Sequence, residues 1–282
     1  MRRRVAPYLL LGPGAAWLLL FFVVPLYYLA ELSLNAGVFG SYHFDWHWAN
    51  YKDALQLYDT QFVRSFLYAG LATLFALLLA YPLAYTIAFK AGRWRNVLLF
   101  AVVAPFFTTY LIRTLAWETI LSDQSPVVKV LDFLGMAPEG HVLATGGAVI
   151  AGLTYNFLPF MVLPIYASLE RIDVRLIEAG KDLYASAAQT FFRVTLPLSA
   201  PGVVAGTLLT FIPASGDYVN AQFLGSANNQ MIGNVIQSLY LKQSDYPAAA
   251  ALSFVLMALI LILVLIYIRF AGSEALMGEE AV

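Results

Sequence analysis

Long apolar segments alternate with short polar connections along almost the whole chain. An α-helix needs roughly 20 apolar residues to cross the hydrocarbon core of a bilayer. Segments that approach or exceed this length are predicted as spans over residues 12–32, 62–89, 96–121, 145–169, 201–223 and 247–270. The pattern therefore predicts an all-α, polytopic membrane protein with six transmembrane helices, which form a single domain over residues 1–282.

Two of the polar connections between the predicted spans have a predicted structure or location of their own. The segment 122–144 is rich in turn residues and is predicted to be a loop with a short helix over 127–134. The segment 170–197 is predicted to be a cytoplasmic loop. The first apolar segment resembles a signal peptide, but it is long and no small-residue cleavage site follows, so we expect it to be retained as a signal anchor.

Composition supports a membrane location and excludes several functions. Hydrophobic residues make up 61% of the 282 residues and charged residues 12%, whereas soluble domains carry about a quarter charged residues. The net charge is −1 and the basic residues are dispersed, so nucleic-acid binding is not indicated. The chain has no cysteine, which excludes disulfides, thiolate metal sites and cysteine nucleophiles.

Basic residues in short loops favour the cytoplasmic side of the membrane and so predict the orientation of the spans. The residues that fall on one side of the predicted spans are Arg2, Arg3, Arg4, Lys90, Arg93, Arg95, Arg171, Arg175, Lys181, Arg193 and Arg269. Fewer fall on the other side, so we expect a multi-pass protein of the cell (plasma or inner) membrane with both termini in the cytoplasm. The outer loops lean acidic, which mildly favours cations at the mouth.

The stretch 176–197, LIEAGKDLYASAAQTFFRVTLP, interrupts the apolar pattern. Small and apolar residues recur at steps of three and four residues, which predicts a short amphipathic helix with one apolar face. This face consists of Leu176, Ala179, Gly180, Leu183 and Ala187. Pro197 and Pro201 are expected to end the helix before the next span. An amphipathic pattern does not decide between a helix lying on lipid headgroups and one that docks on a protein.

The same stretch resembles the cytoplasmic signature loop of ABC importer permeases, E-A-A-x-x-x-G followed nine residues later by an apolar residue, one residue more and L-P. The matching positions are Glu178, Ala179, Gly180, Tyr184, Val194, Leu196 and Pro197. Two positions depart from the pattern, because Gly180 stands where a second alanine is usual and Tyr184 stands where glycine is usual.

The resemblance extends over most of the chain. Within these permeases, the chain is similar to the spermidine/putrescine branch. It is carried by the segments 80–89, 106–121, 156–173, 210–225 and 229–241. It implies a type I permease subunit of an ATP-driven importer, with polyamines as substrate. Permeases for iron, thiamine or opine-like solutes resemble the same segments, so another small solute is the alternative.

The resemblance also implies the partners and the division of labour. These are a second permease subunit, expected to be a different chain, two ATP-binding subunits that hold ATP and Mg²⁺, and an extracytoplasmic binding protein. The Walker pattern G-x-x-x-x-G-K-[ST] is absent, so this chain is expected to bind no cofactor and to take energy from a partner or an ion gradient. An ion-coupled secondary transporter is less favoured, because no internal repeat is evident. No motif of an intramembrane enzyme is present, and no catalytic residue is expected.

In the family, the signature loop forms a coupling helix that docks on the ATPase. The resemblance places Glu178, Ala179 and Gly180 at the docking surface. We add Lys181 and Asp182, because these two residues are polar and are expected to be exposed. Tyr184 raises a question of geometry, because a tyrosine adopts a positive φ only at a cost. Either the chain runs straighter here than in the family, or the ATPase has a hollow for the ring.

Ionisable residues inside a span cost about 2.5 to 3.5 kcal/mol at a helix centre and therefore mark candidate sites. Thr109, Arg113 and Trp117 are spaced to share one helix face, which predicts a polar stripe along the substrate path. Alternatively, Arg113 extends outwards to the lipid headgroups.

Asp217 follows Pro213 and Gly216, which are expected to break the fifth span, and broken helices often border the path of a transporter. With Tyr218 and Asn220 it offers a carboxylate, an aromatic ring and an amide, which suit an ammonium group. Alternatively, Asp217 pairs with the partner subunit or lies close to outer water. His43, Asp45 and His47 would bind a metal only if the backbone curled to suit, so no metal site is predicted.

Overall fold

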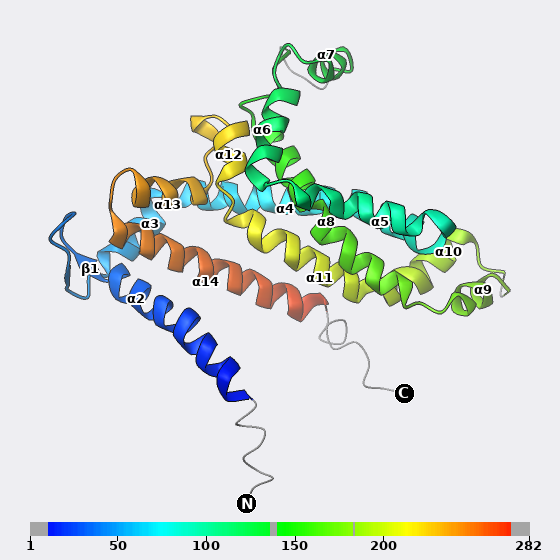
Figure 1. Ribbon diagram of the computed structural model, residues 1–282, viewed down its shortest axis with the longest axis horizontal. Helices are drawn as coiled ribbons and strands as arrows, with labels where there is room; N and C mark the ends of the chain where they lie inside the picture. Colours follow the sequence, from blue (N-terminus) through cyan, green and yellow to red (C-terminus); the bar gives the residue numbers. More distant parts are fainter. Residues whose placement is uncertain (1–10, 136–139, 183, 272–282) are drawn as a thin grey trace, which may run out of the picture. The chain divides into compact units, whose positions relative to one another are not determined.

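Figure 1 shows the computed structural model, which describes residues 11–135, 140–182 and 184–271. The chain separates into two compact units, one of Met1–Asp59 with Val235–Ala258 and the other of Thr60–Asn234 with Leu259–Val282. The predicted single domain stays a prediction. Arg2, Arg3 and Arg4, used above to orient the chain, lie outside the described residues.

The first unit begins with an apolar helix over Leu11–Ser33, which includes the π-helical turn η1 (Leu19–Val23) and α2 (Val24–Ser33). The two-residue strands β1 (Asn35–Ala36) and β2 (His43–Phe44) pair antiparallel, and α3 (Ala49–Leu57) follows. The hydroxyl of Tyr42 donates to the backbone carbonyl of Ser244 at 2.5 Å, which ties this hairpin to the turn before α14 (Tyr246–Ala271).

The second unit is a bundle of helices. In chain order these are α4 (Asp59–Phe89), η2 (Gly92–Trp94), α5 (Arg95–Val103), η3 (Ala104–Phe107), α6 (Tyr110–Ile120), α7 (Pro126–Phe133), α8 (Gly146–Glu170), α9 (Val174–Asp182), α10 (Ala187–Thr190), η5 (Phe191–Thr195), α11 (Leu196–Ser215), α12 (Val219–Leu224), η6 (Ala227–Asn229) and the start of α13 (Ile232–Leu241). Figure 1 places α9 and α12 at opposite ends of this unit.

The prediction of an all-α, polytopic membrane protein is confirmed. Among the described residues, five helices are long and apolar enough to cross a membrane, and a sixth candidate is a pair of helices bent by 97°. The helix predicted over 127–134 is present as α7.

Two predicted spans differ from the structure. The span predicted over 96–121 is the bent pair, because the chain is extended at Thr108 and Thr109. The span predicted over 201–223 is a helix over Ala187–Ser215 instead. It begins early because Ser186 and Gln189 form a capping box, and it ends at Gly216.

The expectation that prolines end the helix before this span was wrong. Pro197 lies in the first turn of α11, and the helix continues into it from η5, a π-helical turn. A π turn shifts the backbone hydrogen bonds by one residue. A proline has no N–H to donate, and Pro197 follows directly after this π turn, where the regular hydrogen-bond pattern is already interrupted.

Small residues allow α11 to pack closely against α8. Gly202 and Gly206 are spaced by four residues, as in the small-xxx-small pattern of membrane helix pairs. A Cβ atom at Gly202 would lie 2.5 Å from the carbonyl oxygen of Pro164, and one at Gly206 would lie 2.9 Å from the sulfur of Met161. The contact at Gly202 is with backbone, so it cannot relax by a change of rotamer.

We therefore expect Gly202→Val to destabilise the protein by about 2 to 3 kcal/mol, because overpacking against backbone forces the helices apart. The measurement is the unfolding midpoint of the purified protein in detergent. Gly70→Val on α4 is the matched control, since a Cβ there meets nothing within 4 Å. Equal midpoints for the two variants would contradict the packing role of Gly202.

Candidate functional site

A buried polar cluster surrounds the break after α11. The carboxylate of Asp217, which is 8% exposed, accepts from the Tyr110 hydroxyl at 2.5 Å on Oδ2 and from the Asn220 backbone N–H at 2.8 Å on Oδ1. The side-chain amide of Asn220 donates to the Tyr110 hydroxyl oxygen at 2.5 Å. Asp217 thus holds the first turn of α12 and fixes Tyr110 of α6 against it.

The cluster extends to α8 through a second amide. Asn156 donates to Oδ1 of Asn220 at 3.1 Å and lies 3.4 Å from the Thr114 hydroxyl. Asn156, Asn220 and Thr114 are all buried. Their hydrogen bonds join α6, α8 and α12, three elements far apart in sequence, into one polar core.

Sequence reasoning missed Tyr110, Thr114 and Asn156. Asn156 carried a usable signal, because an amide in the middle of the apolar run 145–169 has to find a partner. Tyr110 carried a weaker signal, since a tyrosine inside the predicted span 96–121 can pack as an aromatic ring without marking a polar site.

The other predicted path residues are not gathered at the cluster. Thr109 precedes α6 and is exposed, and the ring of Tyr218 is 42% exposed. Tyr218 contributes through its backbone, where its carbonyl accepts from the Asn234 amide at 2.8 Å. Trp117 packs near Tyr155, with 5.4 Å between ring centroids. The polar stripe of Thr109, Arg113 and Trp117 along the path stays a prediction.

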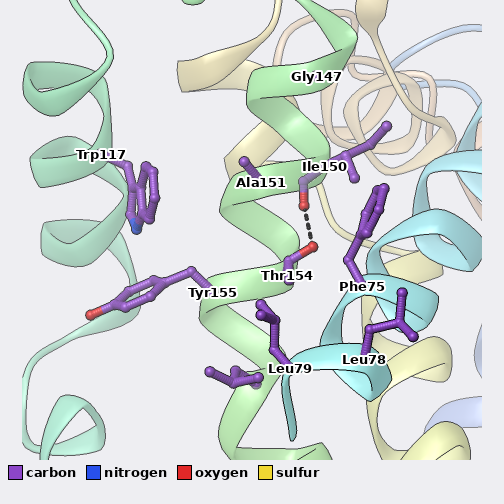
Figure 2. Close-up of a pocket in the computed structure, with 10 residues that line it drawn as sticks. Phe75, Leu78, Leu79, Trp117, Gly147, Ile150, Ala151, Thr154 and Tyr155 are labelled. Atoms are coloured by element: carbon purple, nitrogen blue, oxygen red, sulfur yellow. Dashed lines mark hydrogen bonds between the residues drawn. The ribbon is translucent and has the colours of Figure 1, made fainter. Parts of the chain in front are cut away.

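Trp117 and Tyr155 line an apolar hollow of about 620 Å³ between α4, α6 and α8, shown in Figure 2. Phe75, Leu78 and Leu79 face α8 across it. The Thr154 hydroxyl donates to the Ile150 carbonyl at 2.7 Å within α8, so it is already satisfied. The hollow offers apolar contact and is distinct in chemistry from the polar cluster.

Arg113 is buried within the chain, at 9% exposure. Its guanidinium carbon lies 5.7 Å from the centroid of the Phe106 ring and 5.6 Å from that of Tyr110. Its Nε and Nη1 atoms are buried and have no hydrogen-bond partner among the described residues. The alternative in which Arg113 extends outwards does not match this position.

The predicted docking helix forms as α9, but the described residues of the expected stripe do not share one covered face, and Leu183 of that stripe lies outside the described residues. Glu178, Ala179 and Asp182 are exposed, whereas Gly180 faces the next element, since a Cβ there would lie 3.3 Å from Cγ2 of Thr190. The backbone of Lys181 belongs to α9, while its side chain lies outside the described parts of the chain. Gly180 therefore allows α9 to approach α10 and does not itself present an exposed surface.

Tyr184 occupies the turn that ends α9. Its φ is +58°, and the N–H of Ala185 donates to the carbonyl of Gly180 at 3.2 Å. This six-to-one hydrogen bond after a left-handed residue is the Schellman arrangement, in which glycine is usual. The helix therefore does not run straighter, since the bend is kept with a tyrosine in the position of the glycine. The ring is 98% exposed.

We expect Tyr184→Gly to stabilise this turn by about 1 kcal/mol, because glycine adopts the left-handed conformation without a steric cost. The measurement is hydrogen exchange of the Ala185 amide, which should slow about fivefold for that difference. Tyr184→Ala is the control: it removes the ring but keeps Cβ, so exchange should stay near the wild-type rate. Faster or unchanged exchange in Tyr184→Gly would contradict the expectation.

Helices that span the membrane, a broken span with a buried polar cluster, and a separate amphipathic helix before the span Ala187–Ser215 together define a membrane permease. The chain belongs to the family of binding-protein-dependent transport system inner membrane components, whose model matches residues 13–273.

Similar proteins extend over most of the chain. The spermidine/putrescine transport system permease protein PotB of Haemophilus influenzae is 38% identical over 257 residues, which are 90% of each chain. The protein of the same name from Escherichia coli K12 is 40% identical over 222 residues, 78% of this chain and 81% of that one. A bacterial alginate ABC transporter, solved with its alginate-bound periplasmic protein, matches with a TM-score of 0.73 and 19% identity over 97% and 96% of the two chains. This last likeness shows the fold alone.

Proposed function

We propose that this chain is the membrane-spanning permease subunit of an ATP-driven importer that carries spermidine or putrescine. The observation that supports the substrate is the similarity, over nine-tenths of both chains, to a permease named for spermidine/putrescine transport. The family description supports delivery of the substrate by an extracytoplasmic binding protein.

The chemistry of the polar cluster suits a cationic substrate. An ionised carboxylate has about four acceptor positions, and the described hydrogen bonds to Asp217 use two of them. Capacity is therefore left for an ammonium group. Asp217 also lies between the end of the span Ala187–Ser215 and the short helix α12, and such interruptions between helices often border the path of a transporter. We infer that Asp217 and Asn220 border the substrate path, with Tyr218 at its more exposed side.

Energy would come from partner subunits. We infer that two ATP-binding subunits hold ATP and Mg²⁺ and dock on the coupling surface, which we define as Glu178, Ala179, Asp182 and Tyr184. All four are exposed on α9 or directly after it. A second permease chain would complete the path. ATP binding would draw the coupling surfaces together and open the path outwards, and hydrolysis would reverse this change. In this arrangement both chain termini lie in the cytoplasm.

The test is uptake of labelled spermidine and putrescine by cells with and without the gene, at matched membrane potential. It is combined with vanadate-sensitive ATP hydrolysis by the purified complex. We expect uptake to be lost with the gene, and hydrolysis to be stimulated by the substrate-loaded binding protein. Normal polyamine uptake without the gene would contradict the substrate, while vanadate-sensitive hydrolysis would still support the importer.

A further inference from the structure

The surroundings of Arg113 are those of a site for an organic cation. Aromatic ring faces attract ammonium and guanidinium groups within about 6 Å of the ring centroid. The Phe106 and Tyr110 rings both meet this distance to Arg113, at 5.7 and 5.6 Å. The Tyr110 hydroxyl donates to the Asp217 carboxylate, which leaves more electron density on the ring and strengthens its attraction for a cation.

Arg113 itself is poorly satisfied in this position. Its side chain is more than nine-tenths buried, and neither Nε nor Nη1 has a hydrogen-bond partner among the residues that the structure describes. A buried charged donor without a partner is costly. Among the described residues, attraction to the two rings is what holds the guanidinium here. When the guanidinium leaves, no described hydrogen bond from Nε or Nη1 has to break.

The local backbone allows such an exchange. Phe106 lies in η3, before the extended residues Thr108 and Thr109, whereas Tyr110 and Arg113 lie in α6 beyond the 97° bend. Tyr110 is tied to Asp217 and Asn220 by its hydroxyl. The guanidinium is the partner that can be exchanged, because a change of its rotamer breaks no described hydrogen bond at Nε or Nη1, whereas Tyr110 is held by its hydroxyl.

We propose that the faces of Phe106 and Tyr110 form a binding site for an alkylammonium group, and that Arg113 occupies this site as an internal cation when no substrate is present. The substrate amine competes with the guanidinium for the rings. This inference rests on the proposed function for its cationic substrate and changes the role of Arg113, which competes with the substrate instead of binding it. Asp217 acts on the site by positioning Tyr110.

The test is equilibrium dialysis of labelled putrescine against the purified permease complex without its binding protein. An internal cation that occupies the site about 90% of the time lowers the apparent affinity about tenfold. Arg113→Gln should therefore bind putrescine about tenfold more tightly than wild type. Arg113→Lys, which keeps a cation, should stay near wild type. Affinity in Arg113→Gln equal to or weaker than wild type overturns the proposal and assigns Arg113 a structural role.

The ring contribution has a matched control. Phe106 and Phe107 are adjacent and both reach the surface, but Phe106 is the one near Arg113, while the Phe107 ring packs near Phe100. In the Arg113→Gln background, Phe106→Leu should abolish the tighter binding and Phe107→Leu should retain it. Loss of the tighter binding in both double variants overturns the assignment of the site.

If Arg113→Gln does not assemble, the two phenylalanine variants are compared in the wild-type background by the KM of putrescine uptake. A KM raised by Phe106→Leu and not by Phe107→Leu supports the site, and equal values overturn it. Failure of this inference is distinct from failure of the proposed function. Polyamine uptake that depends on the gene, together with no tightening in Arg113→Gln, overturns the inference alone.

Discussion

Asp217→Asn is expected to lower kcat/KM for spermidine uptake by about 10- to 100-fold, since hydrogen bonds to charged groups contribute about 1.5 to 3 kcal/mol. The substitution keeps the size of the side chain. Its amide oxygen can still accept from the Asn220 N–H, and its amide nitrogen can donate to Tyr110, so the turn into α12 should persist. What is lost is the negative charge that attracts an ammonium group.

A second aspartate provides the matched control. Asp245 accepts from the backbone N–H of Ala248 at 3.2 Å at the start of α14, as Asp217 does from Asn220 at 2.8 Å at the start of α12. Asp245→Asn should leave uptake unchanged. The measurement is uptake kinetics together with the amount of assembled complex in the membrane. Wild-type kinetics in Asp217→Asn would contradict a role in the path, and loss of assembly would indicate a structural role for the charge.

Gly180→Leu is expected to reduce uptake and substrate-stimulated ATP hydrolysis about tenfold or more, which corresponds to about 1.4 kcal/mol of lost docking free energy. Even a single Cβ at Gly180 would lie 3.3 Å from Cγ2 and 3.4 Å from Oγ1 of Thr190. A leucine side chain therefore pushes α9 away from α10 and displaces the coupling surface. Insertion into the membrane should be intact, because α9 is not a span.

Thr190→Ala is the compensating variant. The Thr190 hydroxyl is buried and has no hydrogen-bond partner among the described residues, so its removal alone should cost little. In the double variant with Gly180→Leu it makes room for the new side chain and should restore part of the hydrolysis. Full activity of Gly180→Leu alone would contradict the proposed coupling. No recovery in the double variant would show that the contact with Thr190 is not the cause of the defect.

For the amphipathic helix α9, the spacing of apolar residues predicted the helix but not its buried face. The stretch from Leu176 correctly predicted a helix, but the apolar face was assigned by spacing alone. In the structure Ala179 and Leu176 are exposed, while Ile177 and Gly180 face the rest of the unit. Spacing identifies residues that share a face, but only the neighbouring elements decide which face is covered.

The polar cluster, too, could be predicted only in part, because its members come from separate helices. The expected break at Pro213 and Gly216 singled out Asp217 and Asn220. The helix does end at Gly216, but Pro213 lies inside α11 and does not interrupt it. Two residues from distant parts of the chain complete the cluster. Tyr110 is 107 residues from its partner Asp217, and Asn156 is 64 residues from its partner Asn220. Nothing in the local pattern indicates which polar residues of separate helices will meet.

The sequence by itself determined the class of protein, the number and approximate position of the apolar segments, and the location of the amphipathic loop. These follow from the length and polarity of continuous segments, which the bilayer constrains directly. The tertiary structure decided that the predicted third span is a pair of helices bent by 97°, that Tyr184 keeps the turn of a glycine, and that Arg113 lies near two aromatic rings. Each of these depends on contacts or backbone angles set by packing between segments, which no local pattern of residues specifies.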